Sequence, residues 1–319
     1  MKICACEWKS VCGDDLSFSE IERLGEVSYY GKPSPDELPS VIGDSEVLLC
    51  SKVRVTSRLL DACPKLKYVG LMATGYNNVD LAACRERGVT VTNIPDYSSD
   101  AVAQMTMTFL LNFATSFREY TASTQRGDWT RSELFCYYPY PLTELQGKTL
   151  GLVGMGSIGE KVARLAEAFG MKVIYHTRNR KDCEREYVLL DDLFARSDYV
   201  SLHLPLNGET EKLIGRDALS KMKRSAFLIN TARGGLVDEK ALAAALSDGV
   251  IAGYAGDVLT VEPQSADCPL IGAKNCILTP HIAWAPKETR ARLIGILRDN
   301  LEGYLRGNVQ NQVNENKKR

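Results

Sequence analysis

A glycine-rich turn between two segments of different periodicity constrains this chain more than any other feature. Residues 149–153 form an apolar run that is typical of a buried strand. Residues 160–169 then carry apolar side chains at helical spacing, and Gly170 separates them from a second apolar run at 171–175. The turn has the spacing G-x-G-x-x-G inside a strand–turn–helix–strand unit, and this combination predicts a dinucleotide-binding site.

Each glycine of the turn has a predicted role at the pyrophosphate of such a ligand. Gly154 permits a tight turn, Gly156 lets the backbone approach the phosphates, and Gly159 lets the helix pack closely on the strand. The positive end of the helix dipole then faces the phosphates. The predicted loop consists of Gly154, Met155, Gly156, Ser157, Ile158 and Gly159.

Length and charge limit the class of protein. A chain of 319 residues is long enough for about two domains. Its formal net charge of −1 gives no reason to expect nucleic acid or a membrane as a partner. No apolar run approaches the ~18 residues of a transmembrane helix, and the N-terminus resembles a first strand more than a signal peptide. We therefore expect a soluble, cytoplasmic protein.

The ten cysteines are scattered along the chain. Cys4 and Cys6 are the only close pair, and no second pair of ligands follows nearby. Because a zinc site needs such a second pair, we expect no metal and interpret the cysteines as small, reduced core residues.

Strand-like and helix-like segments alternate on both sides of the central turn. Apolar runs at 45–50, 66–72 and 89–93 are separated by amphipathic segments, which predicts an α/β domain with a parallel sheet. After the turn unit, four more strands are predicted at 199–204, 226–230, 251–258 and 276–279. A dinucleotide-binding sheet has this number of strands.

Three further segments complete the expected organisation. One long helix is predicted from Ala101 to about Thr124, after a cap at residues 98–100. Residues 127–147 are irregular and rich in aromatic side chains, which usually marks a functional or packed segment. A last helix is predicted from Pro286 to about Arg306, and the polar tail at 308–319 is expected to fray.

Chemically useful side chains lie near the ends of the later strands. Arg233 can bind a carboxylate through two hydrogen bonds and polarise an adjacent carbonyl, and His281 can donate a proton. Glu262 can hold the His281 ring and favour its protonated form. This set suits reduction of a 2-keto acid. An ordinary Arg–Glu ion pair with an unrelated loop histidine is the alternative. His203 lies inside an apolar run, so we interpret it as a core histidine.

Several motifs in one order make a family resemblance specific. They are residues 73–80 (ATGYNNVD), 154–159, 203–206 (HLPL), 230–235 (NTARGG), Asp257 with Glu262 and Pro263, and 280–285 (PHIAWA). On these, the chain resembles the D-isomer-specific 2-hydroxyacid dehydrogenases along its whole length. Residues 73–80, 135–151 and 280–285 look most like the hydroxypyruvate reductase/glycerate dehydrogenase branch.

The resemblance implies two Rossmann-like α/β domains with parallel sheets and a substrate cleft between them. Residues 1–98 plus 286–319 would form the substrate-binding domain, and residues 99–285 the dinucleotide-binding domain. Arg233, Glu262 and His281 would be catalytic. The backbone at Thr74 and Gly75, together with Arg233, would bind the substrate. Besides the glycine loop, the implied cofactor contacts are Thr106, Thr177, Arg178, Pro205, Thr231, Ala232, Asp257 and His281.

The end of the second strand of the turn unit departs from the pattern of NAD-preferring members. Those members usually carry an Asp there, which bonds the ribose 2′-hydroxyl. Here residues 175–180 read YHTRNR, without a carboxylate and with two arginines. We therefore expect NADP (NADPH) to be favoured and NAD to be possible, with Arg178 as the main contact and Thr177 assisting. The alternative is that Arg178 is merely solvated.

Two functions other than a dehydrogenase of small 2-keto acids stay open from the sequence. One is a nucleotide-sensing, corepressor-like binding protein on the same fold, and the other is a phosphoglycerate dehydrogenase. The resemblance also implies a homodimer formed through the nucleotide domains. We expect some of the aromatic side chains of residues 127–147 to pack on the partner, because an irregular aromatic segment would otherwise expose a large apolar patch. These side chains are Trp129, Phe135, Tyr137, Tyr138 and Tyr140. The alternative is that this segment folds back on its own domain.

Overall fold

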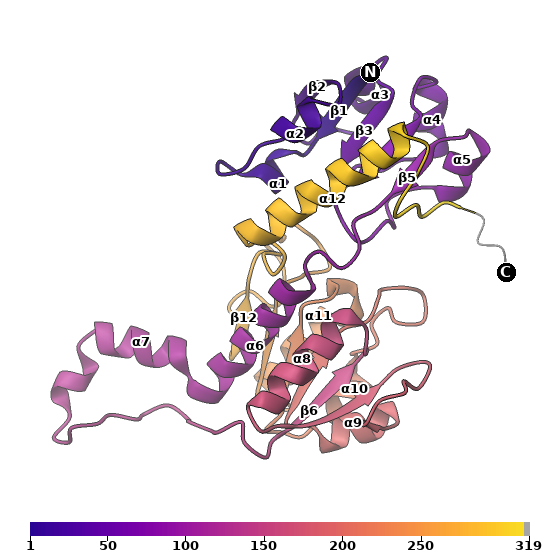
Figure 1. The fold of residues 1–319 in the computed structure, drawn as a ribbon. Coiled ribbons are helices and arrows are strands. Elements are labelled where there is room, and N and C mark those ends of the chain that lie inside the picture. Colours follow the sequence, from indigo (N-terminus) through magenta and orange to yellow (C-terminus); the bar gives the residue numbers. More distant parts are fainter. Residues whose placement is uncertain (316–319) are drawn as a thin grey trace. The chain divides into compact units, whose positions relative to one another are not determined.

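The computed structural model describes residues 1–315, which divide into two compact units. The first unit is Met1–Ser98 together with the chain from Ala285 onward, and the second is Ser99–Trp284. Each unit is built on one parallel sheet with helices packed against it (Figure 1). The chain is therefore an α/β protein with two Rossmann-like units, as the sequence predicts.

The sheet of the first unit has the strand order β2-β1-β3-β4-β5. Its strands are β1 (Lys2–Cys6), β2 (Glu26–Tyr30), β3 (Val47–Cys50), β4 (Tyr68–Leu71) and β5 (Thr90–Thr92). Its helices are α1 (Lys9–Cys12), α2 (Ser19–Glu22), α3 (Leu38–Ile42), α4 (Ser57–Ala62), α5 (Leu81–Glu86) and α12 (Lys287–Leu305). Every residue of β3 and β4 is buried, which explains their continuous apolar sequence.

Strand β2 and the chain after α12 differ from the sequence-based expectation. The alternation of exposed and half-buried residues in β2 gives no continuous apolar run, so this strand was not predicted. The expectation that the polar tail frays is wrong for residues 308–315. Asn314 is buried, its Nδ2 donates to the Val89 carbonyl at 2.7 Å, and its Oδ1 accepts from the Val91 N–H at 3.1 Å. Residues 316–319 lie outside the described part of the chain.

The sheet of the second unit has the strand order β12-β11-β10-β9-β6-β7-β8. Its strands are β6 (Thr149–Val153), β7 (Lys172–His176), β8 (Glu186–Tyr187), β9 (Tyr199–Leu202), β10 (Phe227–Asn230), β11 (Gly253–Gly256) and β12 (Cys276–Leu278). The chain builds outward from β6 in one direction and then returns to β9 on its other side. This reversal creates the crevice in which open α/β sheets bind ligands.

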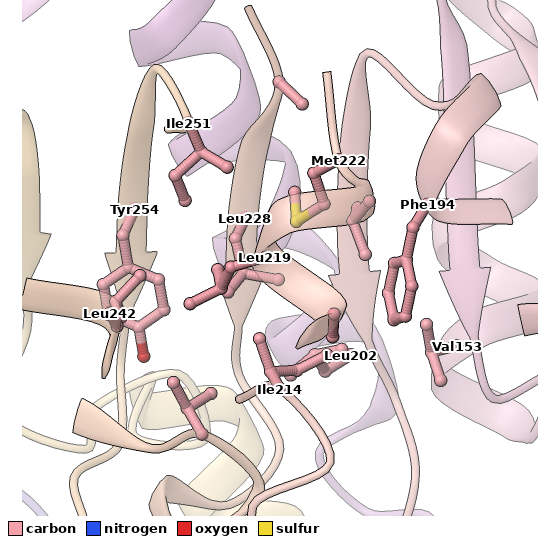
Figure 2. Packing of buried hydrophobic residues seen from close by; sticks show 14 of the residues in the cluster. Val153, Phe194, Leu202, Ile214, Leu219, Met222, Leu228, Leu242, Ile251 and Tyr254 are labelled. Carbon is pink, nitrogen blue, oxygen red and sulfur yellow. The ribbon is translucent and has the colours of Figure 1, made fainter. Parts of the chain in front are cut away.

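Helices cover both faces of this sheet. They are α6 (Ser99–Thr115), α8 (Ser157–Ala168), α9 (Leu190–Arg196), α10 (Arg216–Lys221) and α11 (Glu239–Ser247). The unit also contains α7 (Phe117–Gln125) and 3-10 turns at Asp128–Arg131 and Gly234–Leu236. Figure 2 shows Phe194, Leu219 and Leu242 from three of these helices packed with strand residues such as Leu202 and Leu228. Helices α6 and α8 pack in a second cluster with β6 and β7. A rigid sheet therefore supports the loops at its carboxyl edge.

The expected long helix from Ala101 to Thr124 is wrong, because the chain forms two helices, α6 and α7. Ser116 between them has φ +46°, which a right-handed helix cannot include. Its hydroxyl donates to the Pro141 carbonyl at 2.7 Å. Figure 1 shows α7 and the segment after it extending away from the sheet of the second unit. Within residues 1–315, no helix has both the length and the apolar character to span a bilayer.

Candidate active site

The glycine loop joins β6 to α8 and has the geometry expected at a pyrophosphate. Gly154 has φ +105°, and a Cβ there would lie 2.2 Å from the His203 carbonyl oxygen. A Cβ on Gly159 would lie 2.4 Å from the Gly154 carbonyl oxygen, so the helix can approach the turn only with glycine at this position. A Cβ on Gly156 would meet nothing within 4 Å, which leaves open space in front of the N-terminus of α8. These residues fit the phosphates of a dinucleotide.

The other residues of the loop divide between core and surface. Met155 is buried in the cluster beneath the loop, Ile158 is half-buried, and Ser157 is exposed at the start of α8. The loop is therefore anchored by one side chain, and its backbone faces solvent.

Two threonines that were predicted to contact the cofactor come together from distant parts of the chain. Thr106 of α6 and Thr231, directly after β10, place their hydroxyl oxygens 3.1 Å apart, and both side chains are buried. Ala232 is half-buried, and Pro205 is exposed two residues beyond the His203 turn after β9. Pro205 follows β9, and Thr231 and Ala232 follow β10, which is the neighbouring strand of the sheet.

The end of β7 carries cationic and neutral side chains. His176 Nδ1 lies 3.0 Å from the Val188 carbonyl oxygen, and Thr177 Oγ1 donates to the Asn179 carbonyl at 2.7 Å. Arg178 and Arg180 are exposed and form no ion pair with any residue in the described range. Both guanidinium groups are thus available to an anion from solvent.

Arg233 lies in a turn that a buried amide supports. Asn230, the last residue of β10, donates from Nδ2 to the Arg233 carbonyl at 2.9 Å, and its Oδ1 accepts from the Ala232 N–H at 3.0 Å. The Arg233 side chain is exposed, and its Nη1 donates to the Ala232 carbonyl at 2.7 Å. It forms no ion pair with a carboxylate among residues 1–315, so the guanidinium can bind a carboxylate from outside the chain.

His281 and Glu262 form a hydrogen-bonded pair. His281 Nδ1 lies 2.7 Å from Glu262 Oε2, and Glu262 Oε1 accepts from the Leu259 N–H at 3.0 Å. The two side chains are 27% and 32% exposed, so a ligand can reach them. The contact at Nδ1 leaves Nε2 as the ring atom that can pass a proton outward. The alternative of an Arg–Glu pair beside an unrelated histidine is not what the structure shows.

Asp257 follows β11 and is buried, with 1% of its surface exposed. Its Oδ1 accepts from Thr279 Oγ1 at 2.5 Å and from the Ile282 N–H at 2.9 Å, and its Oδ2 accepts from the Ala283 N–H at 2.8 Å. A carboxylate has roughly four acceptor positions. The chain's own donors occupy three of them, and the contact of Asp257 with a nicotinamide carboxamide stays a prediction.

His203 has the environment of a structural histidine. Its Nε2 lies 2.9 Å from Ser201 Oγ, and burial lowers its pKa from 6.5 to about 3. The imidazole therefore stays neutral near pH 7 and cannot supply a proton.

The predicted substrate loop belongs to the first unit. Thr74 donates from Oγ1 to the Ile94 carbonyl at 2.7 Å, and the Thr74 carbonyl accepts from Asn93 Nδ2 at 2.7 Å. The N–H groups of Thr74 and Gly75 donate to no group among the described residues. These contacts fix the loop, and two N–H donors stay available for a carboxylate.

Three supporting residues were not predicted from the sequence, namely Asn93, Asn230 and Thr279. Each is a polar residue at or just beyond the end of an apolar strand, and this position is the one sequence signal that could have identified them. Their hydrogen-bond partners can be identified only from the three-dimensional structure.

Comparison with known proteins supports one family. A family model described as the NAD binding domain of D-isomer specific 2-hydroxyacid dehydrogenases matches residues 107–283. The chain is 38% identical to a hydroxypyruvate reductase of Blautia hydrogenotrophica over 99% of this chain and 100% of the relative. It is 40% identical to a glycerate dehydrogenase of Methylorubrum extorquens over 88% and 89% of the two chains.

A solved structure is similar over nearly the same length. An NADPH-dependent glyoxylate/hydroxypyruvate reductase of Sinorhizobium meliloti, in complex with NADP and malonate, aligns with a TM-score of 0.82 and 30% sequence identity. The alignment covers 98% of this chain and 96% of that one.

Proposed function

Because the chain belongs to the D-isomer-specific 2-hydroxyacid dehydrogenase family, we propose that it reduces a small 2-keto acid of the hydroxypyruvate or glyoxylate type to the D-2-hydroxy acid. The observation that carries this proposal is the 2.7 Å contact between His281 Nδ1 and Glu262 Oε2. It provides a proton donor held by a carboxylate, in the unit that also holds the glycine loop and Arg233. The relatives named as hydroxypyruvate reductase and glycerate dehydrogenase support the same class of substrate.

The residues of the second unit account for the chemistry of the reduction. The glycine loop would hold the phosphates of a reduced nicotinamide dinucleotide, and this cofactor would supply the hydride for the keto carbon. Arg233 binds the substrate carboxylate and polarises the adjacent carbonyl, which favours negative charge on its oxygen. His281 donates its Nε2 proton to that oxygen, and the hydroxyl forms. Glu262 holds the ring through Nδ1 and stabilises its positive charge before the transfer. The N–H groups of Thr74 and Gly75 are the proposed second contact for the carboxylate.

A substrate panel tests the proposal. The purified protein is assayed with NADPH and with hydroxypyruvate, glyoxylate, pyruvate or 3-phosphohydroxypyruvate, and the reverse reaction is assayed with D- and L-glycerate. We expect the highest kcat/KM with hydroxypyruvate or glyoxylate and oxidation of D-glycerate only. Binding of NADPH without turnover of any keto acid would instead favour the corepressor-like alternative. A preference for the phosphorylated substrate would favour phosphoglycerate dehydrogenase, and neither alternative is favoured by the relatives.

For the cofactor, we propose that NADPH is preferred over NADH. The 2′-phosphate carries about two negative charges, and Arg178 is exposed, forms no ion pair among the described residues and lies two residues after the end of β7. No carboxylate lies at residues 175–180 to bond a 2′-hydroxyl or to repel a phosphate. Thr177 provides a second polar group beside Arg178.

Two arginine variants test the cofactor proposal. Arg178→Ala should lower kcat/KM for NADPH by about 10- to 100-fold and leave the value for NADH nearly unchanged, because charge-assisted hydrogen bonds to the phosphate are lost. Arg180→Ala is the matched control, since Arg180 is also exposed and unpaired. A preference for NADH in the wild type, unaffected by Arg178→Ala, would contradict the assignment.

We also propose a homodimer in which residues 127–147 pack on a second copy of the chain. Phe135 is 92% exposed, Tyr138 is 67% exposed and Trp129 is 47% exposed. The contacts of the segment with α7 are local, such as the edge-to-face pair of Tyr120 and Tyr140 with ring centroids 5.2 Å apart. An apolar surface of this kind is typical of a site where chains meet.

Light scattering at micromolar concentration tests the assembly. We expect a dimer for the wild type and a monomer for a variant with Trp129, Tyr137 and Tyr138 replaced by Ser. Leu189→Ser removes an exposed apolar side chain elsewhere in the unit and should leave the dimer intact. A wild-type monomer, or a dimer that survives the triple substitution, would support a segment that folds back on its own domain. We further propose a cytoplasmic location, because ten free thiols suit a reducing compartment.

A further inference from the structure

We propose that Thr279 is a positioning residue for His281 and that it acts through the buried carboxylate of Asp257. This inference rests on the proposed role of His281 as the proton donor. Thr279 lies directly after β12, two residues before His281, and its N–H donates to the Gly256 carbonyl at 3.0 Å. The pairing of β12 with β11 therefore sets the position of the Thr279 hydroxyl beside the residue that follows Gly256, which is Asp257.

One carboxylate holds the chain on both sides of His281. Thr279 Oγ1 and the Ile282 N–H both donate to Asp257 Oδ1, at 2.5 Å and 2.9 Å. The Ala283 N–H donates to Oδ2 at 2.8 Å. The His281 N–H donates to the Asp257 carbonyl at 2.8 Å, so the whole turn is tied to a single residue of the sheet.

The turn needs this support because His281 has a conformation that costs free energy. Its φ is +54°, in the left-handed region that residues with a Cβ rarely adopt. Such a conformation persists only when surrounding contacts fix it. Here it directs the imidazole to Glu262, where Nδ1 and Oε2 lie 2.7 Å apart. Loss of the support would let the turn relax and would move the proton donor.

The Thr279 hydroxyl is the one side-chain donor to Asp257 among residues 1–315. A carboxylate that is 1% exposed needs its donors, because water cannot replace them. The other two donors are backbone N–H groups of the turn itself. If the Thr279 hydroxyl is removed, the Asp257 carboxylate can find another donor only by moving. Its contacts with the Ile282 and Ala283 N–H groups then move with it.

Thr279→Val tests this role, because valine has the shape of threonine without the hydroxyl, and Thr279→Ser is the matched variant that keeps the donor. We expect kcat to fall by about tenfold in the valine variant and by less than about twofold in the serine variant. The solvent isotope effect on kcat should rise in the valine variant alone, since a displaced His281 makes proton transfer slower.

The same variants in a His281→Ala background separate the two proposals. If Thr279 acts through His281, then Thr279→Val adds no further loss of kcat there. Full activity of His281→Ala would contradict the proposed function. An impaired His281→Ala protein that loses a further tenfold on Thr279→Val would overturn the positioning role alone, as would equal losses in the valine and serine variants or unchanged kcat in both. Thr279→Ala removes the same hydroxyl and carries the test if the valine variant does not fold.

Discussion

Two histidines follow strands at the same edge of one sheet, and their surroundings give them opposite chemistry. His203 follows β9, contacts the Ser201 hydroxyl and has a pKa lowered to about 3 by burial. His281 follows β12, contacts the Glu262 carboxylate and is partly exposed. Position at a strand end is therefore not enough to make a proton donor. Burial keeps the His203 ring neutral, whereas the His281 ring is partly exposed and hydrogen-bonded to a carboxylate.

Among the variants that test this difference between the two histidines, removal of the His281 imidazole should cause the largest loss of kcat. His281→Ala should lower kcat by roughly 10²- to 10⁴-fold, because no other group would protonate the carbonyl oxygen. Steady-state assays with the preferred keto acid measure it, with NADPH binding as the control for folding. Turnover close to that of the wild type would contradict the proposal that His281, unlike His203, is the proton donor.

A substitution of Arg233 extends this comparison, because Arg233 is the residue of the second unit proposed to bind the substrate carboxylate. Arg233→Ala should lower kcat/KM for the keto acid by about 10²-fold and change both KM and kcat, since binding and polarisation are lost together. Arg233→Lys keeps the charge but cannot form the two-pronged contact, so it should recover only part of the loss. A change in KM alone would limit Arg233 to binding.

Glu262→Gln tests whether the charge of the partner matters or only its hydrogen bond. The amide can keep a contact with Nδ1 but has no negative charge to stabilise the imidazolium. We expect kcat for reduction to fall by about tenfold at neutral pH. An unchanged kcat would mean that Glu262 only orients the ring.

His203 should show its effect in stability and not in turnover. The folded state keeps the ring neutral down to about pH 3, whereas the unfolded chain takes up a proton below about pH 6.5. The free energy of unfolding should therefore fall as the pH drops through this range, by at most about 1.4 kcal/mol per pH unit. His203→Gln should flatten this dependence in urea titrations from pH 7 to pH 4 and keep kcat within about threefold. An acid dependence equal to that of the wild type would assign the loss to other groups.

The parts of the fold that were predictable are those in which local sequence and burial agree. The apolar runs of β3, β4 and β6 became buried strands because each is covered on both faces. β8 was missed because it has only two residues, Glu186 and Tyr187. The break at Ser116 was missed because apolar periodicity continues across it, and the left-handed residue is held by a contact with distant Pro141.

The residues of the proposed active site divide in the same way. Arg233, Glu262 and His281 could be selected from residue type and from their place after strands. Asn230 and Thr279 could not, because their roles depend on turns that the pairing of β10, β11 and β12 brings within reach. The sequence thus indicates the side chains that carry charge or protons. The neutral side chains that hold them in place can be identified only from the three-dimensional structure.

The residues after α12 have a consequence for the handling of this protein. β5 is an edge strand, and the Val313 N–H donates to the Val91 carbonyl at 2.9 Å while Thr92 and Gln312 form an antiparallel bridge. The tail thereby occupies hydrogen-bonding groups that an exposed edge would offer to another molecule. Proteolysis or truncation before Gln310 would expose the hydrogen-bonding groups of the β5 edge. A strand of another molecule could then pair with this edge. Residues 310–315 therefore protect the β5 edge from pairing with a strand of another molecule.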